Sequence, residues 1–445
     1  MLIAAAVAVA AWIRLGDLTM DVIVNDNGVW KAVLLSAITQ TCLYYSDLYD
    51  LRLVADRREF FTRLLQALGA ASFILAAIYF WFPEQIVGRG VFLYAVIAVI
   101  LLVSGWRLLF EWLGRQVVPT ERLLLVGTSP AALTLARELF DRRQELGVTI
   151  VGFVDPDPAK VGQPVINPGV VGTLEDIPSI VRARSVDRVV VSLADARGSL
   201  PMEKLLEMKL ERGVSFDHLA TVYEHYTGKI AVENLRPSWL IFSEGFKKTW
   251  LLRTTKRVMD TCAAIVGLIL AAPLMIGAAL AVKLTSPGPA LFRQRRVGQY
   301  GRVFTVYKIR SMQVDAEART GAVWATASDS RVTNVGRFLR RTRIDEVPQL
   351  WNVLRGDMSL VGPRPERPEF IAQLTEAIPF YGLRHTVRPG LTGWAQVRYT
   401  YAASVEDALE KLQYDLFYIK HLTIAFDVFI VLSTIKTVIQ RRGAQ

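Results

Sequence analysis

Cysteine and histidine are scarce in this sequence, whose 445 residues contain two cysteines and four histidines. Cys42 and Cys262 lie in apolar stretches, and the histidines are dispersed without the spacing of metal ligands. A structural zinc site needs four such ligands, and a disulfide framework needs paired cysteines in an oxidising compartment. The sequence therefore predicts neither, and its cysteine usage fits a reducing compartment for the soluble parts.

A complete dinucleotide-binding fingerprint is also missing. In GTSPAA, which starts at Gly127, only the first glycine of G-x-G-x-x-G is present, and no Y-x-x-x-K pair follows. Alternating apolar strands and amphipathic helices nevertheless predict a Rossmann-like, doubly wound domain over residues 116–225, degenerate or regulatory in its use of nucleotides. Its expected elements are strands at 122–127, 149–154 and 187–195 and helices at 130–146 and 201–212.

Acidic residues are sparse in the C-terminal part of the chain. The formal net charge is +11, yet residues 1–250 hold 25 Lys and Arg against 26 Asp and Glu, whereas residues 251–445 hold 27 against 15. Such an excess favours an anionic partner, which could be phospholipid headgroups, a phosphorylated substrate or nucleic acid. Because the charge adjoins an apolar segment and no nucleic-acid module is recognisable, no nucleic-acid partner is predicted.

Long apolar runs, by contrast, are abundant, and the mean hydropathy is +0.30. Residues 1–115 contain four of them, at 1–13, 29–45, 66–83 and 91–110. We interpret them as four transmembrane helices, although the short first run leaves open whether it completes a span. A signal peptide is the alternative for that run, but a basic start and a cleavage-like end are missing. The four arginines of the 46–65 loop place that loop, and everything after residue 110, in the cytoplasm.

A fifth apolar stretch, 258–282, follows a connector predicted over residues 226–252. Basic residues flank it on both sides, among them Lys256 before it and Lys283 after it, which contradicts a simple crossing. A re-entrant helix over residues 256–283, broken at Ala272–Pro273, would enter and leave on the cytoplasmic side and resolve the conflict. An ordinary span with an unfavourable charge balance is the alternative, and charge alone does not decide between them.

Two adjacent carboxylates, Asp345 and Glu346, stand in RTRIDEVPQLWNVLRGDMSLVGPRPERPEF, residues 341–370. An Asp before a proline and an apolar-periodic VPQLWNVL is typical of a helix cap, and the pattern alone favours that reading. The alternative is a carboxylate kept ionised by a helix start and nearby arginines, which can act as a nucleophile or a metal ligand.

Cationic motifs surround this pair in the sequence. FTVYKIRSM, residues 304–312, predicts a strand that presents Lys308 and Arg310 as a phosphate clamp. GPRP holds Arg364 on a backbone stiffened by two prolines, and the turn-rich VRPGLTGWAQV carries Arg388. Each motif alone could be an ordinary surface feature, but their combination behind an apolar helix favours a site for phosphorylated ligands.

Taken together, these motifs resemble the bacterial sugar transferases, the monotopic phosphoglycosyl transferases that load a sugar 1-phosphate onto polyprenyl phosphate. The matching stretches occur in family order over about 190 residues. They are Lys256–Arg257 with Asp260, SPGPALFRQRRVG (286–298), YKIRSM (307–312), RIDEVPQLWNVLRGDMSLVGPRPE (343–366) and RPGLTGWAQV (388–397). The N-terminal part resembles the long members of the family. The family's re-entrant helix often breaks at Ser-Pro, which here is Ala272–Pro273.

The resemblance implies a mechanism and its participants. Asp345 would attack the β-phosphate of a UDP-sugar and release UMP, and polyprenyl (undecaprenyl) phosphate would then take the sugar phosphate from the aspartate. Glu346 would assist as a Mg²⁺ ligand or a base, with Asp345 and Asp357 as further candidate ligands of Mg²⁺. Lys308, Arg310, Arg364 and Arg388 would bind the substrates. A homodimer is a further expectation from the family.

The predicted architecture is an N-terminal four-helix transmembrane bundle, a Rossmann-like doubly wound domain and a C-terminal, mainly helical catalytic domain, residues 253–445, with a re-entrant membrane helix. We expect a multi-pass protein of the bacterial cytoplasmic membrane with its catalytic domain on the cytoplasmic face. The final apolar stretch, 426–442, is expected to lie in the membrane interface or to pack on the catalytic core. The alternative function is a catalytically inactive membrane scaffold or regulator of polysaccharide synthesis.

Overall fold

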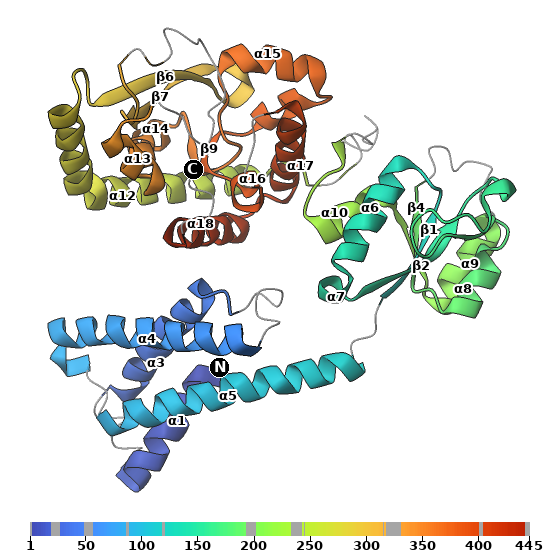
Figure 1. Cartoon of the computed structure of the whole chain (residues 1–445), viewed down its shortest axis with the longest axis horizontal. Helices are drawn as coiled ribbons and strands as arrows, with labels where there is room; N and C mark the ends of the chain where they lie inside the picture. Colours follow the sequence, from blue (N-terminus) through green and yellow to red (C-terminus); the bar gives the residue numbers. More distant parts are fainter. Residues whose placement is uncertain are drawn as a thin grey trace. The chain divides into compact units, whose positions relative to one another are not determined.

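The computed structural model describes residues 2–18, 27–48, 57–85, 89–117, 121–192, 202–232, 243, 245–314, 316, 331–399 and 404–440. Helices dominate at both ends of the chain, and a parallel sheet lies between them in sequence (Figure 1). Each of these parts is built from the pattern of apolar residues that the sequence supplies.

Four α-helices occupy the N-terminal region, where the four apolar runs are. They are α1 (Leu2–Leu15), α3 (Gly28–Tyr45), α4 (Arg57–Trp81) and α5 (Arg89–Val117), with the short 3-10 turns η1 (Gly16–Leu18) and η2 (Pro83–Gln85). Ile3, Cys42, Leu64 and Val99, one from each helix, belong to a single buried cluster. Among the described residues of this region, Phe60–Trp81 is long and apolar enough to cross a membrane, and Ala5–Arg14 and Leu93–Trp106 are shorter apolar helices. The predicted helices are therefore present, whereas four complete crossings stay a prediction.

A five-stranded sheet follows and confirms the predicted α/β unit. Its strands are β1 (Glu121–Val126), β2 (Val148–Val154), β3 (Val170–Gly172), β4 (Arg188–Val191) and β5 (Ser215–His218), in the order β3-β2-β1-β4-β5. The pairs β1–β4, β2–β3 and β4–β5 are all parallel. This is the strand order of a doubly wound sheet, in which ligands bind beyond the carboxyl ends of the strands. The end of the expected 187–195 strand lies outside the described residues.

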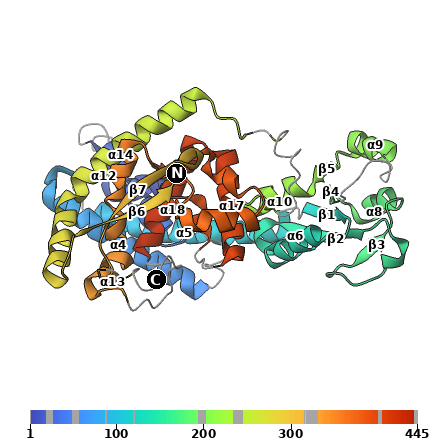
Figure 2. The same cartoon turned by 90° about the horizontal axis from the view of Figure 1, so that it is seen from above.

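Helices cover both faces of this sheet, with α6 on one side and α8 and α9 on the other (Figures 1 and 2). The elements are α6 (Pro130–Asp141), α7 (Arg143–Leu146), η3 (Pro158–Lys160), α8 (Ile177–Arg184), α9 (Met202–Arg212) and α10 (Leu219–Thr227). The single helix predicted at 130–146 is wrong. Arg142, with φ −108° and ψ 12°, interrupts it, and Gly147 at φ 62° ends the second piece. The apolar pattern runs through the interruption, so the sequence does not reveal it.

The C-terminal region begins with the long helix α12 (Trp250–Thr285), which contains Pro273. Figures 1 and 2 draw α12 as two limbs set at a steep angle to each other. Proline removes a helical hydrogen bond and clashes with the preceding turn, so it is the ordinary cause of such a bend. The segment is thus a single bent helix, and a re-entrant path through a membrane remains a prediction.

An antiparallel hairpin and a set of helices complete this region, which is mainly helical as predicted. The hairpin consists of β6 (Leu291–Val297) and β7 (Val303–Ile309), joined through η5 (Gln299–Gly301). The other elements are α13 (Asn334–Arg341), η6 (Ile344–Glu346), α14 (Gln349–Arg355), β8 (Ser359–Val361), α15 (Pro368–Ala377), η7 (Tyr381–Thr386), β9 (Gly390–Thr392), α16 (Trp394–Arg398), α17 (Val405–His421) and α18 (Ile424–Ile439). Val361, Trp394, Leu412, Tyr418 and Ile430 are members of its main core cluster. This core fixes the loops that carry the candidate site.

Candidate active site

The acidic pair lies in η6, the tight turn between α13 and α14. Asp345 is 6% exposed and Glu346 8% exposed, so both carboxylates are buried. The turn is entered through Arg343, whose φ of 57° is in the left-handed region. A non-glycine residue there costs free energy and is enriched at functional sites. The strained backbone at Arg343 thus costs free energy, and it positions two carboxylates next to each other in the turn.

Asp345 is not a helix cap. The N-cap position of α14 is Pro348, no side chain caps that helix, and among the described residues Asp345 Oδ1 is buried without a hydrogen-bond partner. The cap interpretation, which the sequence pattern favoured, is therefore wrong. Burial, followed by the charge of Glu346, raises the pKa of Asp345 to about 6. Asp345 therefore combines an Oδ1 atom that has no hydrogen-bond partner in the described part of the chain with a raised pKa.

Glu346 has the opposite environment. Its Oε1 accepts hydrogen bonds from Lys308 Nζ at 2.9 Å and from Arg364 Nη2 at 2.6 Å. Burial alone would raise the pKa of Glu346, but Arg364 and Lys308 outweigh that effect and hold it well below its usual value. Arg343 Nη1 also lies 4.0 Å from Glu346 Oε2, so Glu346 is an ionised group that pairs with three cations.

Two of these cations, Lys308 and Arg364, come from the elements that the sequence predicted. Lys308 is on β7, opposite Phe292 of β6. Arg364 follows β8, in a loop that is bound to the stretch around β9, because Gly362 N donates to Thr392 O at 2.9 Å and Gly390 N to Pro363 O at 2.9 Å. A Cβ atom at Gly362 or Gly390 would collide with the opposing backbone, so only glycine allows this approach.

Arg310, Arg388 and Asp357 lie in other surroundings. Arg310 follows β7, is buried, and its Nη2 donates to the Ser286 carbonyl at 3.0 Å and the Ser286 hydroxyl at 2.8 Å. Its Nε and Nη1 atoms are buried without a partner in the described part of the chain. Arg388 is half-buried in the loop before β9, and Asp357 pairs with Arg355 at 3.5 Å. Arg310 therefore already holds the loop after α12, whatever else it binds.

For a divalent metal, the described residues offer a partial set of ligands. No three Asp, Glu, His or Cys side chains among them form a metal-holding group, so Asp357 does not join the acidic pair. Mg²⁺, however, is usually held by one or two carboxylates, with substrate phosphates and water as the remaining ligands. The unpartnered Asp345 Oδ1 beside the Glu346 carboxylate fits that arrangement.

Sequence reasoning missed the roles of Asp427 and Tyr418, which anchor the start of α12 to the site. Lys256 Nζ pairs with Asp427 at 2.5 Å and donates to the Val361 carbonyl at 3.2 Å, just before the loop of Arg364. The Tyr418 hydroxyl donates to Asp427 Oδ1 at 2.8 Å. Asp427 is an acidic residue within an apolar stretch of the sequence. An acid in such a stretch needs a partner when buried, and this was the signal that could have indicated its role.

The neighbours of Lys256 on α12 hold the other side of the site. Arg257 donates to the carbonyls of Val353 at 2.6 Å and Leu354 at 2.8 Å, which belong to the last turn of α14. Asp260 accepts from the Ser359 hydroxyl at 2.7 Å. These charged groups of α12 therefore fix the positions of α14 and β8 rather than facing solvent.

A buried ion pair supports the backbone of Arg364. Arg384 Nη2 pairs with Asp415 at 2.7 Å and also donates to the Arg364 carbonyl at 3.0 Å. Both partners are nearly inaccessible, at 5% and 2% exposure. An ion pair of this kind keeps its geometry only when its remaining hydrogen-bonding capacity is used, which the Arg364 carbonyl provides here. No local pattern predicts this pair, because the two residues are on separate elements.

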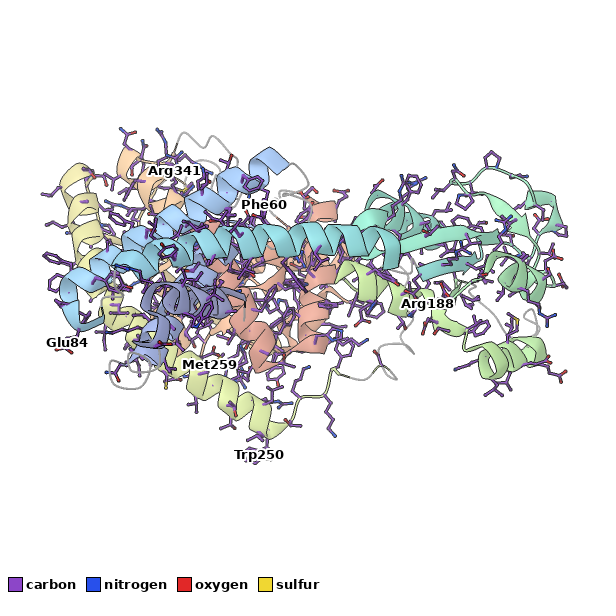
Figure 3. The ribbon with its side chains drawn as sticks, turned by 90° about the horizontal axis from the view of Figure 1, so that it is seen from below. Phe60, Glu84, Arg188, Trp250, Met259 and Arg341 are labelled. Carbon is purple, nitrogen blue, oxygen red and sulfur yellow. The ribbon has the colours of Figure 1, made fainter. Side chains whose placement is uncertain are left out.

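An exposed apolar surface on α12 adjoins this network. Ile265, Ile269, Leu270, Leu274 and Ile276 are each at least 43% exposed, and the whole helix meets the length and hydropathy criteria for a membrane segment. Figure 3 shows the labelled Trp250 at the start of α12, with its side chain directed away from the ribbon. An exposed apolar surface of this size marks an interaction site, and the length and hydropathy of the helix fit a membrane segment.

A buried carboxylate with a raised pKa and an unpartnered oxygen, next to lysine and arginine side chains, marks a candidate active site. Two sequence families match: bacterial sugar transferase over residues 251–441, and CoA-binding domain over residues 45–203. Together with a relative that is 31% identical over 84% of this chain, these matches show that the chain belongs to the bacterial sugar transferase family, a family of enzymes.

Relatives with related names align with more than half of the chain. UDP-glucose:undecaprenyl-phosphate glucose-1-phosphate transferase of Xanthomonas campestris pv. campestris is 31% identical over 84% of this chain and 78% of its own length. The Escherichia coli (strain K12) protein of the same name is 34% identical over 71% and 67%. UDP-N-acetylgalactosamine-undecaprenyl-phosphate N-acetylgalactosaminephosphotransferase of Aeromonas hydrophila is 41% identical over 58% of this chain, which spans 60% of that relative.

Proposed function

We propose that the protein transfers a hexose 1-phosphate from a UDP-sugar to undecaprenyl phosphate and releases UMP, as the first membrane step in assembling an exopolysaccharide, capsule or O-antigen. The names of the relatives support the substrates. The observation that carries the proposal is the contrast within the acidic pair. Asp345 has a buried oxygen with no partner among the described residues, while Glu346 accepts hydrogen bonds from two cations.

Asp345 is the nucleophile in this proposal. One carboxylate oxygen forms a bond to the β-phosphorus of the UDP-sugar, the bond from that phosphorus to the bridging oxygen breaks, and UMP leaves with the electron pair. An oxygen of the acceptor phosphate then attacks the same phosphorus and releases the Asp345 carboxylate. With a pKa of about 6, Asp345 is mostly ionised at neutral pH and still basic enough to attack.

The cations make this approach possible. A carboxylate and two phosphate substrates repel one another unless positive charge lies between them. Lys308 and Arg364 supply that charge, and they are held in place through Glu346. Arg310 and Arg388 are the further substrate-binding candidates, and the two unpartnered nitrogens of Arg310 fit a phosphate oxygen.

The acidic pair is also the proposed Mg²⁺ site. Asp345 Oδ1 and the Glu346 carboxylate would hold the ion, which when bound to a diphosphate neutralises part of its charge. The described residues provide too few ligands to hold it firmly alone. We therefore expect Mg²⁺ to bind together with the nucleotide sugar, so removal of Mg²⁺ with a chelator should abolish UMP release.

Membrane placement completes the proposal. The bent α12 enters and leaves the cytoplasmic leaflet, which puts Asp345 at the depth of the acceptor phosphate, and the N-terminal helices add membrane spans of an inner-membrane protein. The basic flanks of α12, its two limbs and its exposed apolar side chains support this arrangement. A cysteine introduced at Leu284 should be labelled by a membrane-impermeant maleimide from the cytoplasmic side, whereas labelling from the opposite side would make α12 a full crossing.

The decisive experiment measures UMP release from UDP-glucose, UDP-galactose and UDP-N-acetylgalactosamine by the purified full-length protein. Undecaprenyl phosphate and Mg²⁺ are each supplied or withheld. Sustained release that requires both additions, with one sugar preferred, would support the proposal and identify the donor. No release from any UDP-sugar by folded protein would contradict it and favour a scaffold without catalytic activity.

A further inference from the structure

A cavity of about 280 Å³ is lined by Glu346 of the acidic pair. One of its walls is formed by α18, through Val431, Thr434, Ile435 and Val438, and another by Leu360 and Leu391 of the β8–β9 pair. Arg341, Arg343 and Glu346 also line it. The cavity therefore combines a charged part, at the residue that follows the proposed nucleophile Asp345, with a hydrocarbon wall.

The hydroxyl groups in its wall do not make it polar. Thr392 and Thr434 hydrogen-bond to each other at 2.6 Å, and Thr437 donates to the Ser433 carbonyl at 2.9 Å. Because these polar atoms already have partners inside the protein, an apolar ligand can fill the cavity without leaving them unsatisfied. Gln396 is the exception among these lining side chains, because its Oε1 is buried without a partner among the described residues.

The position of α18 explains how such a ligand would enter. One face of the helix is fixed to the core through the fully buried Asp427 and Ile430. Ile435 and Val438, by contrast, are 43% and 36% exposed while also lining the cavity, so the cavity wall continues to the molecular surface. Hence α18 packs on the catalytic core along one face and presents an open apolar face along another.

We propose that this cavity receives the first isoprene units of the acceptor lipid, with its phosphate held by Arg341 and Arg343 beside Asp345. The charge and the apolar wall match an occupant that is anionic at one end and hydrocarbon beyond it. The volume is just below the usual range of about 300 to 1,000 Å³ for ligand pockets, which suits a few isoprene units rather than a whole long chain. α18 is thereby a specificity element for the acceptor. This assignment rests on the proposed function, and it names the residues that would recognise the acceptor lipid.

Val431→Trp, which fills the cavity, tests this inference in the full-length protein. Leu432→Trp is the matched control, because Leu432 is the next residue of α18, is 42% exposed and does not line the cavity. The donor half-reaction is measured without acceptor, as exchange of labelled UMP into the UDP-sugar. The acceptor half-reaction is measured as KM for undecaprenyl phosphate and for the short farnesyl phosphate.

We expect Val431→Trp to raise the KM for both acceptors on the order of tenfold, since contacts with the isoprene units nearest the phosphate are lost. UMP exchange should continue in this variant, and Leu432→Trp should resemble the wild type in both assays. Equal acceptor KM values for the two variants, with exchange intact, would overturn the inference. So would a change confined to vesicle binding, which would assign the cavity to a phospholipid acyl chain.

Two outcomes separate this inference from other failures. If Val431→Trp also loses exchange, Val438→Trp repeats the test farther along α18, and an unchanged acceptor KM in that variant would overturn the inference. If the wild type exchanges UMP with no UDP-sugar, it is the proposed function that fails, before any question about the cavity arises.

Discussion

Asp155, which follows β2 of the parallel sheet, and Asp345, in the transferase region, are both buried carboxylates with a lysine nearby, yet their hydrogen bonding is opposite. Asp155 accepts from the backbone N–H and the hydroxyl of Thr128, from the N–H of Asp157 and from Lys160. Asp345 has an oxygen with no partner among the described residues. The two carboxylates therefore differ in whether an oxygen remains available to bind a further group.

Their acidities follow from this difference. Burial would raise the pKa of Asp155, but the hydrogen bonds from Thr128 and Asp157 and the charge of Lys160 lower it overall. Burial and Glu346 raise the pKa of Asp345 to about 6. A satisfied carboxylate stabilises a fold, whereas an unsatisfied one near neutrality is available for chemistry. We therefore expect substitutions of Asp345 to affect the transfer reaction, and substitutions of Asp155 to affect the free energy of unfolding.

The largest effect is expected for Asp345→Asn. An amide cannot form the covalent intermediate, so UMP exchange should fall by at least about 10³-fold. Removing a buried, unpaired carboxylate should leave the melting temperature unchanged or higher. Both quantities are measured on the same preparation, by UMP exchange and by thermal unfolding. Substantial residual exchange would move the nucleophile to another residue.

The pH dependence of exchange is the next test. Only the ionised Asp345 attacks, and its pKa is about 6, so the rate should be nearly constant above neutrality and fall about tenfold per pH unit well below 6. The initial rate of UMP exchange is measured between pH 4.5 and 8.5 in one buffer mixture. A profile that stays flat down to pH 5 would show that Asp345 is not the group that limits the reaction.

Lys308→Met tests whether Asp345 determines the midpoint of that pH profile. The charge of Lys308 lowers the pKa of Asp345, in opposition to burial and Glu346, so its loss should raise that pKa further. The midpoint of the pH profile should therefore move to higher pH, and the rate at pH 7 should fall less than in Asp345→Asn. A midpoint shifted to lower pH would contradict the assigned electrostatics.

The smallest effect on activity is expected for Asp155→Asn. It should cost roughly 1–3 kcal/mol of folding free energy, because an amide cannot accept all the bonds donated to Asp155. The lowered pKa means that the contribution of Asp155 is complete above its unfolded pKa of about 3.9 and is lost as the pH falls toward the folded value. Denaturant unfolding at pH 7.5 measures the loss, and UMP exchange should remain close to wild type. A large loss of exchange in folded protein would contradict a purely structural role.

Local signals in the sequence predicted much of this architecture. Buried β-strands such as 122–127, the turn at Gly127 and the pairing of Asp345 with Glu346 all follow from contiguous residues. Lys308 was correctly placed on a strand, because the alternation of FTVYKI is a local property. Arg364 was correctly placed on a stiff loop for the same reason. These predictions needed no information about distant parts of the chain.

The remaining features depend on contacts between distant residues. Lys256 meets Asp427 across 171 positions, and Arg384 meets Asp415 across 31, and no local pattern encodes either pair. The helix-cap interpretation of Asp345 failed because a proline-containing helix start looks the same whether or not the carboxylate bonds to the backbone. The break at Arg142 was missed because both pieces keep one apolar face. Arg310 reads as a phosphate ligand in sequence, but the Ser286 loop occupies one of its nitrogens.

The start of α12 has a mechanical consequence. Lys256, Arg257 and Asp260 clamp this helix to the chain segments that carry or support the acidic pair. If α12 lies in the cytoplasmic leaflet as proposed, Asp345 moves with it, so the depth of this helix in the bilayer determines the depth of the nucleophile. The thickness and tension of the surrounding bilayer would then set how well the aspartate meets a lipid phosphate whose height is fixed by the same bilayer.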